Sequence, residues 1–257
     1  MKLDNPFAGL CIEERTETCD VHGDFVSRHV QVTSSRTDWT KCQKCLDAVT
    51  DAERRSDDAK LRAERNSSIV RMAAIPERFM NRDLSNYQAQ TEEQKNALQI
   101  AKLYAEDMSA VMREGRSLIF CGRPGTGKTH LAVGIAKYAM TMGREARFTS
   151  AMNAIRMVRE TYSRNSEISE RQSIARFAEP DLMILDEVGS QLGTEAEKVT
   201  LFDIINARYE RMRPTIVISN LGIEGVRDYL GERAFDRLRE NGGKAVLFNW
   251  NSYRGQK

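Results

Sequence analysis

The chain has 257 residues, of which 40% are apolar and 30% charged, and its formal net charge is +2. This composition can fill the core of one large domain, or of one medium domain with a smaller appendage. The balanced charge excludes any inference of a nucleic-acid partner from global charge, so such a surface has to be a local patch. No run of about 18 apolar residues occurs, and the first residues lead into no apolar signal core, so we expect a cytoplasmic protein without a membrane partner.

Two short pairs of metal-binding side chains lie near the start of the chain. Cys19 and His22 form a C-x₂-H pair, and after nineteen intervening residues Cys42 and Cys45 form a C-x₂-C pair. Such pairs on tight turns bring four sulfur and nitrogen donors together tetrahedrally, as structural zinc requires. We therefore predict a zinc site; the alternative is a chance grouping.

The segment between the two pairs suits a small β-ribbon that carries both turns, with strand-like residues at 29–32 and Trp39. It also contains His29, a competing imidazole, while Cys11 is a spare thiol upstream. The spacing does not decide whether either replaces one of the four ligands.

A charge-dense segment follows over residues 47–68, with acidic and basic side chains at helical spacings. Mixed charges three and four residues apart favour an exposed helix with few apolar anchors. A solvated connector and a partner-docking helix both fit. Pro76 breaks the pattern, and we predict a zinc-binding domain over 1–50, a charged helical linker over 51–72 and a large domain over 73–257.

The large domain contains a G-x-x-x-x-G-K-T loop. A helical pattern over 92–113 and an apolar strand over 117–121 precede the loop, and a helical stretch over 130–142 follows it, which is the context that a phosphate-binding loop requires. Main-chain N–H groups of such a loop point at phosphates beside a helix N-terminus. The residues expected to bind ATP or ADP are Gly122, Pro124, Gly125, Thr126, Gly127, Lys128, Thr129 and His130.

Two adjacent acids, Asp186 and Glu187, end the apolar strand 181–185. The carboxyl end of a central parallel strand faces the nucleotide in α/β folds. Asp186 and the Thr129 hydroxyl are expected to hold Mg²⁺, and Glu187 to orient or deprotonate the attacking water. Acids that merely cap an edge strand are the alternative. The pair predicts ATP hydrolysis in an α/β domain whose parallel sheet is flanked by helices.

Between the loop and the acids, a strand over 146–149 is followed by helical stretches over 152–165 and 169–177. These stretches are rich in arginine, and a solvated helix face is the commoner meaning of such charge. A basic rim that follows a single-stranded nucleic-acid backbone is the functional alternative. The arginines are Arg156, Arg159, Arg164, Arg171 and Arg176.

Three polar residues lie further along the chain. Asn220 follows the buried strand 215–219 and could bind the γ-phosphate or the attacking water, with a turn or helix cap as the alternative. Arg233 and Arg237 are four residues apart on one helical face and could both reach a neighbouring subunit's triphosphate, where an arginine neutralises transition-state charge.

Several segments of the large domain occur together in a fixed order: I-P-E-R-F at 75–79, G-R-P-G-T-G-K-T at 122–129, L-M-I-L-D-E-V-G at 182–189, G-E-R-A-F-D-R-L-R at 231–239 and F-N-W-N-S-Y-R at 248–254. In this order they resemble the DnaC-type replicative helicase loaders of the AAA+ ATPases, over residues 75–254. The last segment is more specific to that family than the generic ATPase motifs.

This resemblance implies an AAA+ ATPase that binds the replicative helicase through its N-terminal domain, assembles into a ring or spiral, and places the helicase on single-stranded DNA. It also implies that Asn220 lies at the sensor position, Arg237 at the arginine-finger position with Arg233 as a second candidate, and that residues 148–177 contact single-stranded DNA.

The zinc-ligand pattern departs from this resemblance, because it looks more like the N-terminal domain of DnaI-type loaders than that of DnaC. An IstB-type transposition helper, which uses the same ATPase core on DNA without a helicase, is the alternative function. A DNA-binding nucleotide switch with slow turnover is a third. The zinc ligands and the F-N-W-N-S-Y-R ending favour the loader.

Overall fold

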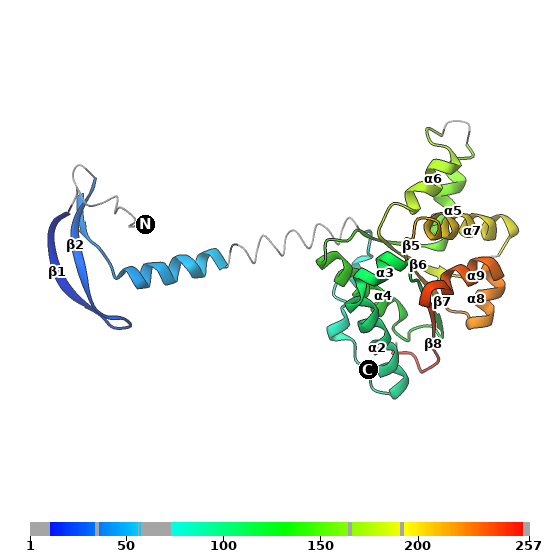
Figure 1. Cartoon of the computed structure of the whole chain (residues 1–257), viewed down its shortest axis with the longest axis horizontal. Helices are drawn as coiled ribbons and strands as arrows, with labels where there is room; N and C mark the ends of the chain where they lie inside the picture. The colour runs from blue at the N-terminus through cyan, green and yellow to red at the C-terminus, as the bar shows by residue number, and fades with distance from the viewer. Residues whose placement is uncertain are drawn as a thin grey trace. The chain divides into compact units, whose positions relative to one another are not determined.

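A computed structural model describes residues 11–33, 36–55, 57, 73–163, 166–190 and 193–253. The chain divides into two compact units, Met1–Arg65 and Asn66–Lys257 (Figure 1). Among the described residues, no helix has both the length and the apolar character needed to cross a bilayer.

The first unit is built on an antiparallel three-stranded sheet in the order β1-β2-β3. Its strands are β1 (Cys11–Cys19), β2 (Gly23–Thr33) and β3 (Arg36–Trp39). The expected ribbon between the ligand pairs is therefore confirmed, but β1 was not expected. Residues 43–55 and 57 are helical, which covers 47–55 and 57 of the charged segment predicted over 47–68, and the rest of that segment lies outside the described residues.

The second unit contains a parallel five-stranded sheet in the order β5-β6-β7-β4-β8, with helices on both faces (Figure 1). The predicted α/β class with a parallel sheet is confirmed. The strands are β4 (Leu118–Gly122), β5 (Ala146–Ser150), β6 (Leu182–Val188), β7 (Thr215–Ser219) and β8 (Lys244–Phe248). The helices are η1 (Glu77–Phe79), η2 (Leu84–Asn86), α2 (Glu92–Glu106), α3 (Met108–Glu114), α4 (Lys128–Thr141), α5 (Ala151–Glu160), α6 (Glu170–Phe177), α7 (Glu195–Tyr209), α8 (Ile223–Leu230), α9 (Glu232–Arg239) and η3 (Glu240–Gly242).

Strand β4 is buried on both faces because successive side chains enter different cores. Leu118 and Phe120 belong to the cluster that includes α2, α3 and α4. Ile119 and Cys121 belong to the cluster that includes α5, α7, α8 and α9. Both helical layers therefore fix the strand that leads into the phosphate-binding loop.

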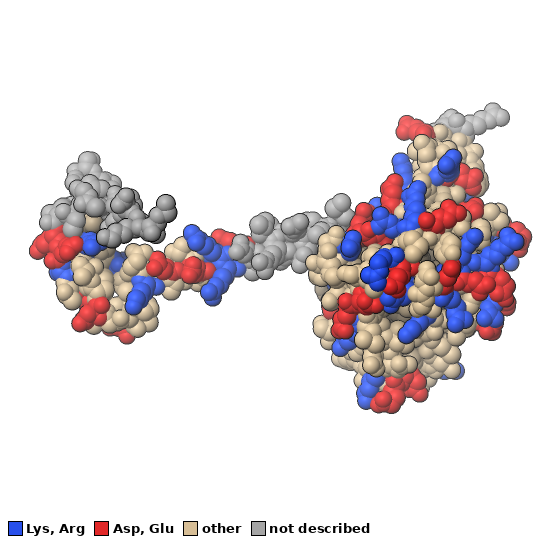
Figure 2. Space-filling model, viewed as in Figure 1, with Lys and Arg blue, Asp and Glu red and all other residues tan. Residues whose placement is uncertain are grey.

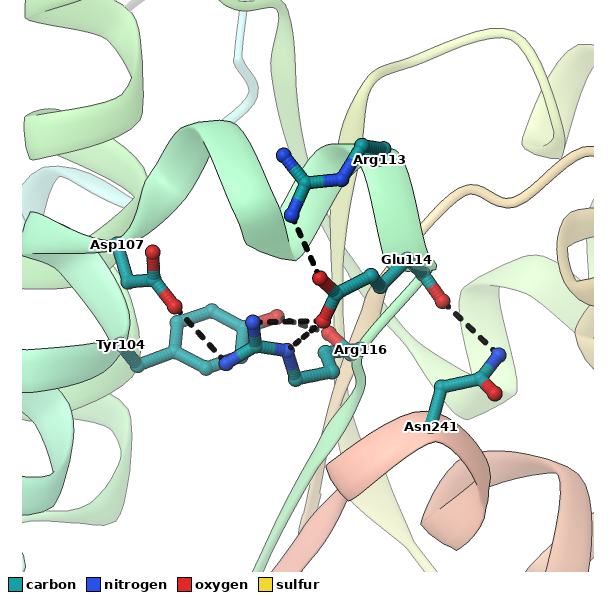
Figure 3. A network of polar contacts seen from close by, with 6 residues as sticks. All are labelled: Tyr104, Asp107, Arg113, Glu114, Arg116 and Asn241. Carbon is teal, nitrogen blue, oxygen red and sulfur yellow. Dashed lines mark hydrogen bonds and ion pairs between the residues drawn. The ribbon is translucent and has the colours of Figure 1, made fainter.

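The helix expected over 92–113 is two helices, α2 and α3, which meet at Asp107. Arg116 lies between the Asp107 and Glu114 carboxylates, at 2.9 and 2.7 Å, and so holds the break in place (Figure 3). The Tyr104 hydroxyl donates to the Arg116 carbonyl at 2.5 Å. Gly115 ends α3 in the left-handed conformation at φ 65°, which glycine adopts without strain.

Arg208 of α7 is fully buried and ties the end of α6 to the sheet. Its guanidinium donates to the carbonyls of Phe177, Pro180 and Pro214 and to the Thr215 hydroxyl. Burial lowers the pKa of Arg208 to about 9, and these acceptors compensate the lost hydration. The end of the arginine-containing helix α6 is thereby anchored beside the start of β6, the strand that carries the two acids.

Candidate functional site

A cavity of about 750 Å³ lies at the carboxyl ends of β5, β6 and β7 and over the loop that follows β4. This is where ligands bind in open parallel sheets. Seven of the eight residues predicted to bind nucleotide line it, and Gly122 lies at the base of the loop. Asp186, Glu187 and Asn220 line the same cavity. The structure therefore brings the predicted nucleotide residues together with these three polar side chains.

The loop backbone can only be built with glycine at two of its positions. Gly122 has φ 119°, and a Cβ there would lie 2.4 Å from the Phe248 carbonyl oxygen. Gly127 has φ 95°, and a Cβ there would lie 2.7 Å from the Tyr87 ring. Helix α4 then begins at Lys128 without a side-chain cap. Its first N–H groups face the cavity and suit a phosphate.

Lys128 is buried at the mouth of the loop, where its ammonium donates to the Gly122 carbonyl at 2.7 Å and the Arg123 carbonyl at 2.6 Å. Thr129, one residue further on, donates its hydroxyl to Asp186 at 3.1 Å. Burial raises the pKa of Asp186, so a nearby cation favours its charged form. A hydroxyl and a carboxylate beside the phosphate-binding N–H groups form the oxygen donor set that Mg²⁺ prefers, and Thr129 and Asp186 would hold that ion.

Glu187 occupies a strained position beside these groups. Its φ is 61°, in the left-handed region that a glutamate rarely adopts. The pairing of β6 with β7 shifts register between Leu185 and Val188, which is a bulge at the two acids. Strain of this kind is typical of functional sites. The bulge leaves Asp186 buried and turns the exposed Glu187 carboxylate toward the cavity.

Sequence reasoning missed several cavity residues, because they lie in segments without a nucleotide-binding motif. Phe79 and Tyr87 come from the segment before α2, and Asn153 comes from α5. The I-P-E-R-F segment was the one sequence feature that pointed to the cavity residues before α2. His130 lines the cavity, and its Nε2 also lies 2.9 Å from the Asp83 carbonyl; burial lowers the pKa of His130.

Arg233 and Arg237 do not line the cavity of their own chain. Arg233 is exposed at the start of α9. The Arg237 guanidinium instead lies over the Phe202 and Tyr209 rings of α7, at 5.0 and 5.3 Å from their centres. Its Nη1 is buried and has no hydrogen-bond partner among the described residues.

The arginines of the α5–α6 region do not behave alike. Arg159 of α5 forms an ion pair with the buried Glu197 of α7 at 3.3 Å, so its charge is used in packing these two helices. Arg156, Arg171 and Arg176 are exposed and make no ion pair within the described residues, and Arg164 lies outside them. On the face drawn in Figure 2, Lys and Arg are interspersed with Asp and Glu over the second unit.

The four predicted zinc ligands of the first unit come together. The Cys45 and Cys19 sulfurs lie 3.5 Å apart, and the His22 Nδ1 lies 3.3 to 3.8 Å from the three sulfurs. All four atoms lie within 4.8 Å of one another. Zinc with its usual bond lengths places sulfurs about 3.8 Å apart and sulfur about 3.5 Å from nitrogen. The donor set therefore fits zinc.

The environment of the cluster also favours a cation. Main-chain N–H groups of Val21 and His22 lower the pKa of Cys19 to about 6, which favours the thiolate that binds metal. The hydrogen bond with the Cys19 sulfur raises the pKa of Cys45 to about 11, and a dication bound between the sulfurs would favour both thiolates.

The two alternative ligands lie elsewhere. His29 stacks on Trp39 with ring centres 4.9 Å apart, and it is not part of the cluster. Cys11 is at the other end of β1 from Cys19, and eight strand residues span about 27 Å.

The sequence model of the protein family described as IstB-like ATP binding protein matches residues 26–257. The chain belongs to this family. Among its relatives, the replicative helicase loader DnaC of Escherichia coli (strain K12) is 33% identical over 218 residues, which is 85% of each chain. The replicative helicase loader DnaC of Buchnera aphidicola subsp. Schizaphis graminum is 33% identical over 193 residues, 75% of this chain and 77% of the relative.

Two solved structures show the same AAA+ fold. The crystal structure of the DnaC helicase loader matches with a TM-score of 0.61 at 22% identity and covers 68% of this chain and all of that one. The crystal structure of DnaI matches with a TM-score of 0.56 at 16% identity, over 70% of this chain and 94% of that one. The predicted resemblance to this ATPase family is confirmed.

Proposed function

We propose that this IstB-like ATPase is a helicase loader, which binds and hydrolyses ATP and places a replicative DNA helicase on single-stranded DNA. One observation supports the ATPase part above all: the phosphate-binding loop, Asp186, Glu187 and Asn220 line a single cavity. The loader part follows from the two curated relatives, which are named replicative helicase loaders and match three quarters or more of this chain.

ATP cleavage is divided among the residues of the cavity. The N–H groups at the start of α4 and the Lys128 ammonium bind the phosphates, with Lys128 exchanging its two carbonyl partners for phosphate oxygens. Thr129 and Asp186 would hold Mg²⁺, which would neutralise phosphate charge. Glu187 accepts a proton from the attacking water, and Asn220 orients that water or the γ-phosphate.

The first unit is the proposed helicase-docking domain. Val26, Leu46 and Val49 are about half exposed, at 54%, 42% and 55%. Apolar side chains held outside a small zinc-stabilised fold suit a protein partner. The exposed arginines Arg156, Arg171 and Arg176 are the proposed contacts to the single-stranded DNA backbone.

One experiment tests both parts of the proposal. The full chain is mixed with its host's replicative helicase and Mg-ATP, and co-sedimentation with the helicase and phosphate release are measured. We expect a complex and turnover for the wild type, and for Glu187→Gln a complex that binds ATP but releases phosphate at least about 100-fold more slowly. Turnover unchanged in Glu187→Gln would reject the water-activating role, and no complex with helicase would reject the loader.

The IstB-type transposition helper remains the second candidate, because the matching family description carries that name. It predicts DNA-stimulated ATP hydrolysis without a stable helicase complex. The co-sedimentation measurement separates the two functions directly.

A further inference from the structure

The segment after β8 runs beneath the phosphate-binding loop; we call residues 249–253 the C-terminal strap. Trp250 donates its indole Nε1–H to the Thr126 carbonyl at 3.0 Å. The Tyr253 main-chain N–H donates to the Gly125 carbonyl at 3.0 Å. Both acceptors are carbonyls of the loop that lines the cavity.

A second donor to the Thr126 carbonyl comes from the segment before α2. The Tyr87 hydroxyl donates to it at 3.2 Å. The Tyr253 hydroxyl in turn donates to the Gln88 carbonyl and, at 3.1 Å, to the Gln94 side chain. The strap and the segment before α2 thus hold the loop between them.

These carbonyl contacts determine where the loop N–H groups point. In a trans peptide unit, the C=O of one residue and the N–H of the next point in opposite directions. Holding the Gly125 carbonyl therefore turns the Thr126 N–H away from the strap, and holding the Thr126 carbonyl does the same for the Gly127 N–H. Neither N–H donates to a protein acceptor within the described residues, so both are available to a phosphate.

The glycines on either side of Thr126 allow the peptide units of the loop to rotate, so the orientation of the N–H groups needs an anchor. Gly125 and Gly127 both have positive φ, at 74° and 95°, and a glycine can rotate through regions that other residues avoid. Without an anchor on the intervening carbonyls, the peptide units of the loop can turn and withdraw an N–H group from the phosphate.

We propose that Trp250 and Tyr87 are positioning residues for nucleotide: together they fix the Thr126–Gly127 peptide so that its N–H group faces the phosphates. This rests on the proposed ATP-binding function. The strap also gives the F-N-W-N-S-Y segment a physical role that its sequence alone does not reveal.

The test compares Trp250→Phe, Tyr87→Phe and the double variant, with Mg-ADP affinity measured by calorimetry well below the unfolding temperature. Either donor alone can hold the carbonyl, so each single variant should lose less than about threefold in affinity, and the double variant about tenfold or more. The loss in the double variant should exceed the product of the single losses.

Tyr104→Phe is the matched control, because it removes a tyrosine hydroxyl that donates to a main-chain carbonyl, that of Arg116, in the network of Figure 3. Tyr104 does not line the cavity, so this variant should keep wild-type affinity. An equal loss in Tyr104→Phe would overturn the proposal, as would single losses that merely multiply in the double variant.

A second readout needs no nucleotide. Thr126–Gly127 is the only Thr-Gly pair in the sequence, so labelling threonine carbonyls with ¹³C and glycine amides with ¹⁵N gives one NMR signal from this peptide. We expect one sharp signal in the wild type and in Tyr104→Phe, and a broadened or doubled signal in the double variant. A sharp, single signal in the double variant would overturn the proposal. A wild type that binds no Mg-ADP would instead reject the proposed function, while this signal still reports on the strap.

Discussion

The buried Asp186 carboxylate lowers the stability of the nucleotide-free chain. Burial raises the pKa of Asp186, so the folded chain binds that proton more tightly than the unfolded chain, and stability falls as the pH rises above the ordinary carboxyl value near 4. Asp186→Asn removes this penalty. We expect the nucleotide-free variant to gain about 0.5–2 kcal/mol in free energy of unfolding at pH 7, while Mg-ATP binding weakens.

Urea unfolding followed by Trp250 fluorescence measures this difference, in a Trp39→Phe background because the chain has two tryptophans. The gain should shrink as the pH is lowered toward 4. Glu187→Gln is the comparison: Glu187 is exposed and burial is the main cause of the raised pKa of Asp186, so this variant should change stability much less than Asp186→Asn. A less stable Asp186→Asn at pH 7 would contradict the expected penalty.

Residues in one continuous motif were predictable, and residues that act across the sequence were not. The loop glycines, Lys128 and Thr129 follow from spacing, because each serves the phosphate through the local backbone. Tyr87 and Trp250 reach the same loop from about 40 residues before it and about 120 after it. No local pattern encodes such a contact, since it depends on how β8 and the segment before α2 pack.

At the scale of elements, we expect the fold of the first unit to depend on a bound metal ion. Ser27 and Cys42 are its only buried residues within the described part of the chain, and so small a core does not stabilise a fold. We expect one zinc per chain, and we expect Cys45→Ser or a strong chelator to remove the metal and unfold β1–β3. Metal analysis and circular dichroism measure both effects.

The control is Cys11→Ser, which should keep its zinc because Cys11 is far along β1 from Cys19. ADP affinity of the second unit should also survive Cys45→Ser. Full β-sheet content in a zinc-free protein would show that the sheet holds without the metal.

Two elements differ from expectation for identifiable reasons. Strand β1, C-I-E-E-R-T-E-T-C, is polar on both faces and lacks the alternation that indicates a half-buried strand. The pattern over 92–113 is helical throughout, and it gives no sign of the break at Asp107, where the Arg116 side chain from beyond both helices forms an ion pair. The start of α2 was readable, because Thr91 and Gln94 form a capping box.

At the scale of the whole molecule, we expect Arg237 to act on a neighbouring subunit. It does not line its own cavity, so Arg237→Ala should keep the ATP affinity of a single chain and lose about 10³-fold in hydrolysis by the assembly. Mixing Arg237→Ala with Glu187→Gln should restore activity, since one variant supplies an intact cavity and the other an intact arginine. With random assembly, about a quarter of the sites are complete.

Arg233→Ala is the comparison, and it shows which of the two arginines reaches the neighbour. Loss of the Arg237 contacts with Phe202 and Tyr209 should cost only about 0.5–1 kcal/mol, and thermal unfolding measures that effect separately. A mixture as inactive as its components would place the arginine's action within its own chain.

The position of the Lys128 ammonium has a consequence for the turnover cycle. A buried ammonium with no acceptor is energetically unfavourable. If release of ADP left the Lys128 ammonium without an acceptor, that release would be disfavoured. Here the Gly122 and Arg123 carbonyls accept hydrogen bonds from the ammonium. We therefore expect the lysine to exchange these carbonyls for phosphate oxygens when ATP binds and to return to them when ADP leaves, so that its charge has an acceptor at every stage.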